Sequence, residues 1–107
     1  MKNFVSKNNA IRRQFNGVDI DVMALGKDMM LAKMLFKEFD IVPKHKHSNE
    51  QIGYVISGKY KLNIDNQQYD LEPGDSYSVP KNVEHSLEII LAGEIIDVFS
   101  PIRQDYL

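Results

Sequence analysis

The chain of 107 residues contains three histidines, and two of them stand close together in the sequence. His45 and His47 are two positions apart, so on an extended strand both side chains project from the same face. A neutral imidazole is a common ligand for zinc, nickel, copper and iron. The pair alone is as compatible with two surface histidines among the neighbouring lysines as with a metal site. The residues around the pair are therefore needed to distinguish these two interpretations.

Two residues that follow the histidine pair could supply another ligand. Gln51 has the same odd parity as His45 and His47 and shares their face on a regular strand, whereas Glu50 points away. We therefore expect Gln51 to be the ligand, and Glu50 is the alternative if a β-bulge intervenes. A neutral amide leaves the metal with its full positive charge, which makes it a stronger Lewis acid than a carboxylate-ligated metal.

An acidic residue stands in the middle of an apolar segment near the C-terminal end. Ile95, Asp97 and Phe99 alternate on one face of the strand expected there, and Arg103 follows six residues after the acid. A carboxylate in this position needs a partner, a wet cavity or a raised pKa. One interpretation is a structural ion pair between Asp97 and Arg103. The other makes Asp97 an acid/base group and Arg103 a fork for a substrate carboxylate.

The elements that must position these groups are short strands. Apolar and polar residues alternate over 18–22, and period-two patterns recur along the chain with turn signals between them. The segment 29–39 is apolar on both faces, which favours a strand covered on both sides. We expect one strand over 54–65, followed by a hairpin turn at 66–68. Many short strands and no long helix predict an all-β sandwich or small barrel.

The composition fits one globular domain. The chain has 13 basic and 15 acidic residues and a net charge of −2, so no positive field would attract nucleic acid or an anionic membrane. The absence of cysteine excludes disulfides, thiolate metal sites and cysteine nucleophiles. No apolar run approaches the roughly 20 residues of a membrane helix, and the polar N-terminus is unlike an export signal. We therefore expect a cytoplasmic protein, with an arm or edge element over 1–17 and a barrel domain over 18–107.

Two segments around the histidines resemble the two sequence motifs of the cupin superfamily. The first covers 45–58 and has glutamine where many members have glutamate. The second covers 74–85 and has Asn82 where the family pattern has glycine; asparagine tolerates a positive φ, so we expect the turn to form. A usual asparagine after the second motif is Ile89 here.

The resemblance implies a single-domain cupin fold, which is a double-stranded β-helix or jelly-roll barrel. It also implies one divalent metal ion inside the barrel, and such sites accept nickel, zinc, manganese or iron. The ligands that the resemblance implies are His45, His47, Gln51 and His85.

The end of the chain, over 97–107, together with 47–55, resembles the small single-domain cupins of pectin and alginate breakdown. These proteins convert 4,5-unsaturated uronic acid monosaccharides into linear ketonised forms. The resemblance implies a small sugar acid as the partner, and it implies that Asp97, Phe99 and Arg103 are associated with activity beside the metal. Two alternatives stay open. An iron-dependent oxygenase on the same barrel is disfavoured by Gln51, and a non-catalytic sugar-binding or sensing cupin is the other.

The sequence also carries a hint of oligomeric state. The two-faced segment 29–39, together with Ile52, Tyr54 and Ile56 opposite the ligand face, exceeds the apolar surface that one small barrel buries. A homodimer would cover this surface, and cupins are commonly dimers. The alternative is that the N-terminal arm covers it within one chain.

Overall fold

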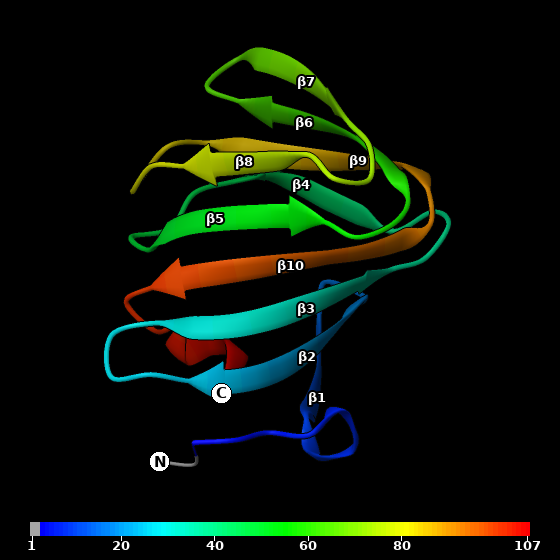
Figure 1. Ribbon diagram of the computed structural model, residues 1–107. Coiled ribbons are helices and arrows are strands. Elements are labelled where there is room, and N and C mark those ends of the chain that lie inside the picture. Colours follow the sequence, from blue (N-terminus) through cyan, green and yellow to red (C-terminus); the bar gives the residue numbers. More distant parts are fainter. Residues whose placement is uncertain (1–2) are drawn as a thin grey trace.

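The protein, described over residues 3–107 by a computed structural model, consists of two antiparallel sheets that face each other (Figure 1). The six-stranded sheet runs, edge to edge, through β1 (Ile11–Phe15), β2 (Val18–Leu25), β3 (Met30–Phe36), β10 (Gly93–Ser100), β5 (Glu50–Val55) and β8 (Ser76–Val79). The four-stranded sheet runs through β4 (Ile41–His45), β9 (His85–Leu91), β6 (Lys59–Ile64) and β7 (Gln67–Leu71). The predicted all-β architecture is confirmed.

Helical structure within residues 3–107 consists of two short 3-10 turns, η1 (Lys7–Asn9) and η2 (Gln104–Tyr106). No helix in the described part of the chain has the length and apolar character needed to cross a membrane. The edge strand β1 pairs with β2 through a tight turn at Asn16 and Gly17, both with positive φ. The domain boundary expected after residue 17 stays a prediction.

The core lies between the two sheets and follows the period of two expected for strands. On β3 the side chains of Met30, Ala32, Met34 and Phe36 are buried, and those between them are half-buried. The predicted strand with two apolar faces is therefore present, since Leu31 and Leu35 point to the outer side. Alternation of this kind fixes the register, because a slip of one residue would exchange the two faces.

The prediction of one strand over 54–65 is wrong. The segment 54–65 is divided between β5 and β6, and the chain changes sheets between them at Gly58, where φ is +91°. A Cβ at Gly58 would lie 2.5 Å from Tyr60 Oη and 2.7 Å from the Leu91 carbonyl oxygen, so the crossing requires glycine. The apolar alternation continues on both sides of the crossing, which is why the pattern read as one strand.

Asparagine adopts a positive φ in two further turns. The hairpin between β6 and β7 turns at Asp65 and Asn66, with φ of 49° and 67°, one residue earlier than expected. Two consecutive residues with positive φ are typical of the type I′ hairpin turn. Asn82, which stands where the cupin pattern has glycine, has φ of 60°, so the expectation that asparagine supports this turn is confirmed.

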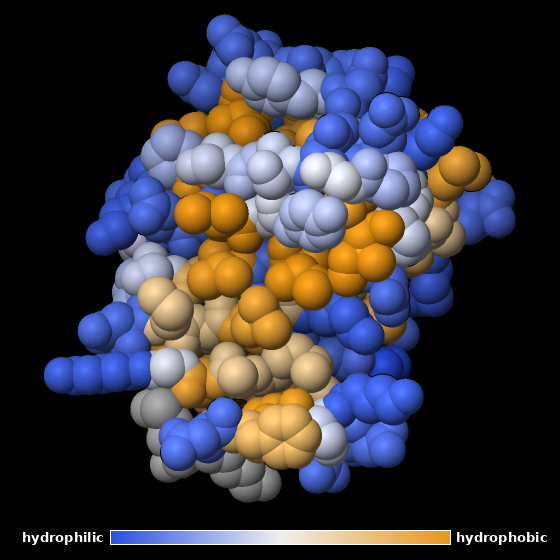
Figure 2. All heavy atoms as spheres, in the orientation of Figure 1, coloured by the Kyte–Doolittle hydropathy of each residue, from blue (hydrophilic) through white to orange (hydrophobic). Residues whose placement is uncertain are grey.

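The outer face of the six-stranded sheet is apolar over its centre. Ile52 and Tyr54 of β5 are 54% and 52% exposed, and Leu31 and Leu35 of β3 are half-buried on the same side. Figure 2 looks onto this face and shows apolar side chains gathered over β5, β10 and β3. We call these four residues, with Ile96 and Val98 of β10, the outer apolar face.

Candidate metal centre and its pocket

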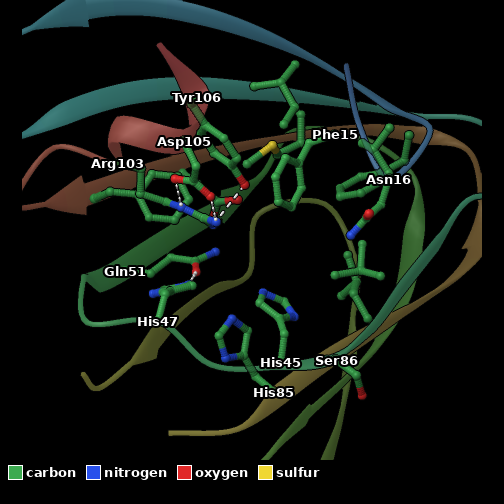
Figure 3. A pocket seen from close by; sticks show the side chains of 18 of the residues that line it. Phe15, Asn16, His45, His47, Gln51, His85, Ser86, Arg103, Asp105 and Tyr106 are labelled. Carbon is green, nitrogen blue, oxygen red and sulfur yellow. Dashed lines mark hydrogen bonds and ion pairs between the residues drawn. The ribbon is translucent and has the colours of Figure 1, made fainter. Parts of the chain in front are cut away.

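Three histidines from different parts of the chain meet inside the fold (Figure 3). His45 is the last residue of β4, and it pairs across the sheet with His85, the first residue of β9. The ring centroids of His45 and His85 are 4.2 Å apart, and those of His47 and His85 are 4.9 Å apart. One ligand atom from each ring lies within 4.8 Å of the others, a spacing that a single cation can bridge.

His47 reaches the cluster by a route that the sequence did not predict. Strand β4 ends at His45, so His47 lies in the loop before β5 and shares no regular strand face with it. The loop is held from two sides. The Asn82 N–H donates to the His47 carbonyl oxygen at 2.8 Å, and the Asn49 side chain donates to the Pro101 carbonyl oxygen at 2.6 Å. A loop fastened in this way can hold a side chain as firmly as a strand does.

The hydrogen bonds of the rings test whether the site suits a metal. In each of the three histidines, Nδ1 lies 2.8–3.0 Å from the backbone carbonyl oxygen of a residue two positions away. Since a carbonyl only accepts, Nδ1 carries the proton in each ring, and in the neutral ring Nε2 then keeps the lone pair with which histidine binds metals. Within residues 3–107, His85 Nε2 is buried without a hydrogen-bond partner, and a cation would satisfy it. Burial also lowers the pKa of His85 to about 4, so this ring is neutral at pH 7.

Gln51 lies inside the pocket, and Glu50 lies outside it. Gln51 on β5 is 8% exposed, whereas Glu50 is exposed to solvent. Gln51 Oε1 lies 3.1 Å from His47 Nε2. With Nδ1 of His47 protonated, both of these atoms present lone pairs, and a cation between them would satisfy both. The placement agrees with the expected choice of Gln51, whose role as a ligand stays a prediction.

Asp97 faces the same space from β10. It is 2% exposed, and Tyr77 Oη donates a hydrogen bond to its Oδ1 at 2.5 Å. Burial raises the pKa of Asp97 to about 6, although the Tyr77 and Gln51 hydrogen bonds and the Arg103 charge oppose the shift. A carboxyl group with this pKa can gain and lose a proton near neutral pH.

The structural ion pair considered for Asp97 and Arg103 is wrong. Among the described residues, the Arg103 guanidinium pairs with Asp105: Nε donates to Oδ1 at 3.1 Å and Nη2 donates to Oδ2 at 2.5 Å. Its Nη1 donates to Tyr106 Oη at 2.9 Å. The guanidinium carbon lies 4.1 Å from the centre of the Tyr106 ring and 5.2 Å from that of Phe99. Phe99 itself is 1% exposed and fills the space between Arg103 and His47.

These groups line one cavity of about 370 Å³. Its polar end holds the histidines, Gln51, Asp97 and the Arg103–Asp105 pair, and Figure 3 shows Gln51 between the histidines and that pair. The rest of its wall is largely apolar, formed among others by Val18, Ile20, Met34, Phe36, Leu62 and Leu87. Such a cavity can hold a small molecule in a fixed orientation.

Three residues of the polar end were missed as site residues by the sequence interpretation: Tyr77, Asp105 and Tyr106. Tyr77 alternates with Ser76 and Ser78 on β8 and is the one aromatic residue of that short strand, which was a usable signal. Asp105 and Tyr106 lie in η2 beyond the last strand. Their place beside Arg103 depends on a chain reversal for which the sequence offered no periodic pattern.

Comparison with known proteins identifies the class. Residues 34–98 match the cupin domain family, and the chain belongs to this family. It is 32% identical over 94 residues to the pectin degradation protein KdgF of Dickeya dadantii strain 3937, a match that covers 86% of each chain.

Solved structures agree with this assignment. An RmlC-like cupin from Shewanella frigidimarina superimposes with a TM-score of 0.92 and 27% identity, covering 100% of this chain and 97% of the other. KdgF from a Halomonas species superimposes with a TM-score of 0.89 and 25% identity, covering 100% of both chains. The family and the fold expected from the two sequence motifs are therefore confirmed.

Proposed function

We propose that this cupin converts 4,5-unsaturated uronic acid monosaccharides into their linear ketonised forms, with the help of one divalent metal ion. The similarity to two KdgF proteins, one of them named for pectin degradation, supports the substrate class. The observation that carries the proposal is the position of Asp97, a buried acid that shares a cavity with three clustered histidines.

The residues that would hold the metal are His45, His47, Gln51 and His85. The ring tautomers and the unpartnered Nε2 of His85 fit this role. When bound, the metal would supply positive charge that stabilises negative charge developing on a substrate oxygen. Three nitrogens and one neutral oxygen as ligands fit nickel, zinc, manganese or iron.

The reaction is an isomerisation that moves one proton. The substrate is a cyclic hemiacetal whose ring oxygen is part of an enol ether conjugated to the carboxylate. The anomeric hydroxyl loses its proton, the bond between the anomeric carbon and the ring oxygen breaks, and an aldehyde and an enolate result. Protonation of the enolate at carbon then gives the ketone. Asp97 accepts the first proton and donates the second, while Tyr77 holds the carboxyl group in place through its hydrogen bond.

Arg103 and Phe99 orient the substrate in this proposal. A planar guanidinium recognises a carboxylate through two parallel hydrogen bonds. Arg103 is fixed among aromatic rings, so it holds the sugar carboxylate at one end of the cavity. Phe99 contacts both Arg103 and His47 and excludes water from the space between them.

A homodimer and a cytoplasmic location complete the proposal. In a twofold dimer the same surface of each copy meets its counterpart, and the outer apolar face could pack against the outer apolar face of a second copy of this chain in this way. Strand β1 pairs with β2 at the far edge of the sheet, so among residues 3–107 this strand does not cover the centre of the outer apolar face.

The deciding experiment mixes purified protein with unsaturated galacturonate and follows the ultraviolet band of the conjugated double bond. Loss faster than the spontaneous rate, without oxygen and in proportion to bound metal, supports the proposal. A requirement for oxygen points to an oxygenase, and binding without loss of the band points to a sensing module; either result overturns it.

A further inference from the structure

Arg103 is a buried cation that needs a permanent counter-charge. Its side chain is 7% exposed, and its guanidinium lies within 5.6 Å of the ring centres of Phe15, Phe99 and Tyr106. Aromatic faces attract a guanidinium but do not neutralise it. A buried charge without an ionic partner is costly, so the group that partners Arg103 decides what else can bind there.

Asp105 supplies that counter-charge, and it binds Arg103 with the same geometry that a carboxylate ligand would use. Its two carboxylate oxygens accept from Nε and Nη2, which is the bidentate arrangement by which arginine binds a free carboxylate. Tyr106 Oη accepts from Nη1, so each guanidinium nitrogen already donates to a protein oxygen. A substrate carboxylate that uses the same two hydrogen bonds has to replace Asp105.

The two members of the pair differ in their freedom to move. The Asp105 side chain is 46% exposed and lies on the 3-10 turn η2, while that of Arg103 is 7% exposed and enclosed by rings. Rotation of Asp105 into water exposes a charge that water solvates well. The same rotation of Arg103 would open the packed wall of the cavity.

From these contacts we infer that Asp105 is an internal carboxylate that occupies the Arg103 fork until a carboxylate ligand replaces it. The inference rests on the proposed function for the class of ligand. It makes Asp105 a residue that sets affinity and selectivity by acting through Arg103. The internal carboxylate keeps inorganic anions off the fork, because only an anion that fits the cavity and the fork together can displace it.

The test is isothermal titration of the metal-loaded protein with galacturonate, a saturated sugar acid that the reaction does not consume. Galactose, which carries no carboxylate, is the matched ligand. Asp105→Asn keeps the shape of the side chain and removes its charge. We expect this variant to bind galacturonate about tenfold more tightly than the wild type, with no change for galactose. Asp105→Glu restores a competing carboxylate and is expected to return to wild-type affinity.

A purely structural role of Asp105 predicts no gain in the affinity of Asp105→Asn for galacturonate. If Asp105 only holds Arg103 in place, Asp105→Asn binds galacturonate more weakly or equally well, and that result overturns the inference. Tighter binding by Asp105→Glu as well would also overturn it, because the charge would then be irrelevant. Turnover of unsaturated galacturonate is measured in parallel. If the wild type turns the substrate over but Asp105→Asn shows no gain in affinity for galacturonate, this inference fails while the proposed function stands.

Discussion

Gly53 lies directly opposite Asp97 in the pairing of β5 with β10, and its missing side chain is the space in which Tyr77 meets the acid. A Cβ at Gly53 would lie 2.5 Å from Asp97 Oδ1 and would overlap the Tyr77 ring. β5 also carries Gln51, two residues earlier on the same face. A glycine inside a strand is unfavourable by itself, so its presence here is explained by the close approach of these two side chains.

Gly53→Ala is expected to destabilise the protein and to separate Tyr77 from Asp97. Overpacking of this kind costs about 1–3 kcal/mol in the free energy of unfolding, measured by urea denaturation. Gly26→Ala is the control, because its nearest neighbour would be the flexible Met29 side chain at 3.2 Å. Equal stability of the two variants would show that the space beside Asp97 is not tightly filled.

Asp97→Asn is expected to retain the fold and the bound metal and to lose nearly all activity. The amide keeps the oxygen that accepts from Tyr77 but cannot carry a proton between substrate atoms. A general acid or base contributes about 10²–10⁴-fold to the rate, which sets the size of the expected loss. Asp70→Asn, on the exposed strand β7, is the matched control. Full turnover by Asp97→Asn would make Asp97 structural.

Tyr77→Phe is expected to change the pH dependence of the reaction. Burial raises the pKa of Asp97, and the Tyr77 hydrogen bond opposes that rise. Removing the hydroxyl therefore raises this pKa beyond about 6. Because Asp97 must be ionised to accept a proton, the acid limb of kcat/KM against pH moves to higher pH, and activity at pH 6 falls more than at pH 8. Tyr69→Phe, which removes an exposed hydroxyl, leaves the profile in place.

The predicted fold followed from residues whose local pattern agrees with their final environment. Alternation on β2 and β3, the turn signals and the motifs around the histidines each specify short strands, and the described chain has them. The prediction failed where the pattern continues through a change of sheet, as it does at Gly58. A side-chain period of two says which face a residue occupies but does not say to which sheet its strand belongs.

The candidate site was predictable for residues on strands and less so for residues in loops. Asp97 lies where parity placed it, facing the cavity from β10. Gln51 also faces the cavity, from β5, but the regular strand that the parity argument assumed from His45 to Gln51 is interrupted, because β4 ends at His45. The partner of Arg103 could not be foreseen, because Asp97 and Asp105 are both near it in sequence and the choice depends on how the chain turns after β10. Such long-range placement has no period that a sequence pattern can report.

Gln51→Glu is expected to bind the metal more tightly and to turn over more slowly. The substitution places a negative charge beside His47 Nε2, which strengthens metal binding and weakens the metal as a Lewis acid. Metal content after dialysis against a chelator measures the first effect, and the ultraviolet assay measures the second. Glu50→Gln is the control: it removes a carboxylate from the neighbouring exposed residue and is expected to change neither the metal content nor the rate of turnover. An effect of Glu50→Gln on metal content would identify Glu50 as the ligand.

Tyr54→Lys is expected to convert the proposed dimer into a monomer without loss of the fold. The residue stands in the outer apolar face, and two lysines brought together there by a twofold axis repel each other. Light scattering coupled to gel filtration gives the mass. Tyr69→Lys, at a tyrosine of similar exposure on β7, is the control and stays dimeric. A wild-type protein that runs as a monomer contradicts the proposed interface directly.

All three imidazoles are oriented by main-chain carbonyl groups only two residues away, so their orientation does not depend on the side chains of the apolar cavity wall. In many metalloproteins a ring is aimed by a distant carboxylate, so changes in the surrounding side chains disturb the ligands. Here the apolar wall can be remodelled without touching the groups that aim the rings. Substitutions in the apolar wall are therefore expected to change which molecules fit the cavity while the three rings keep their orientation.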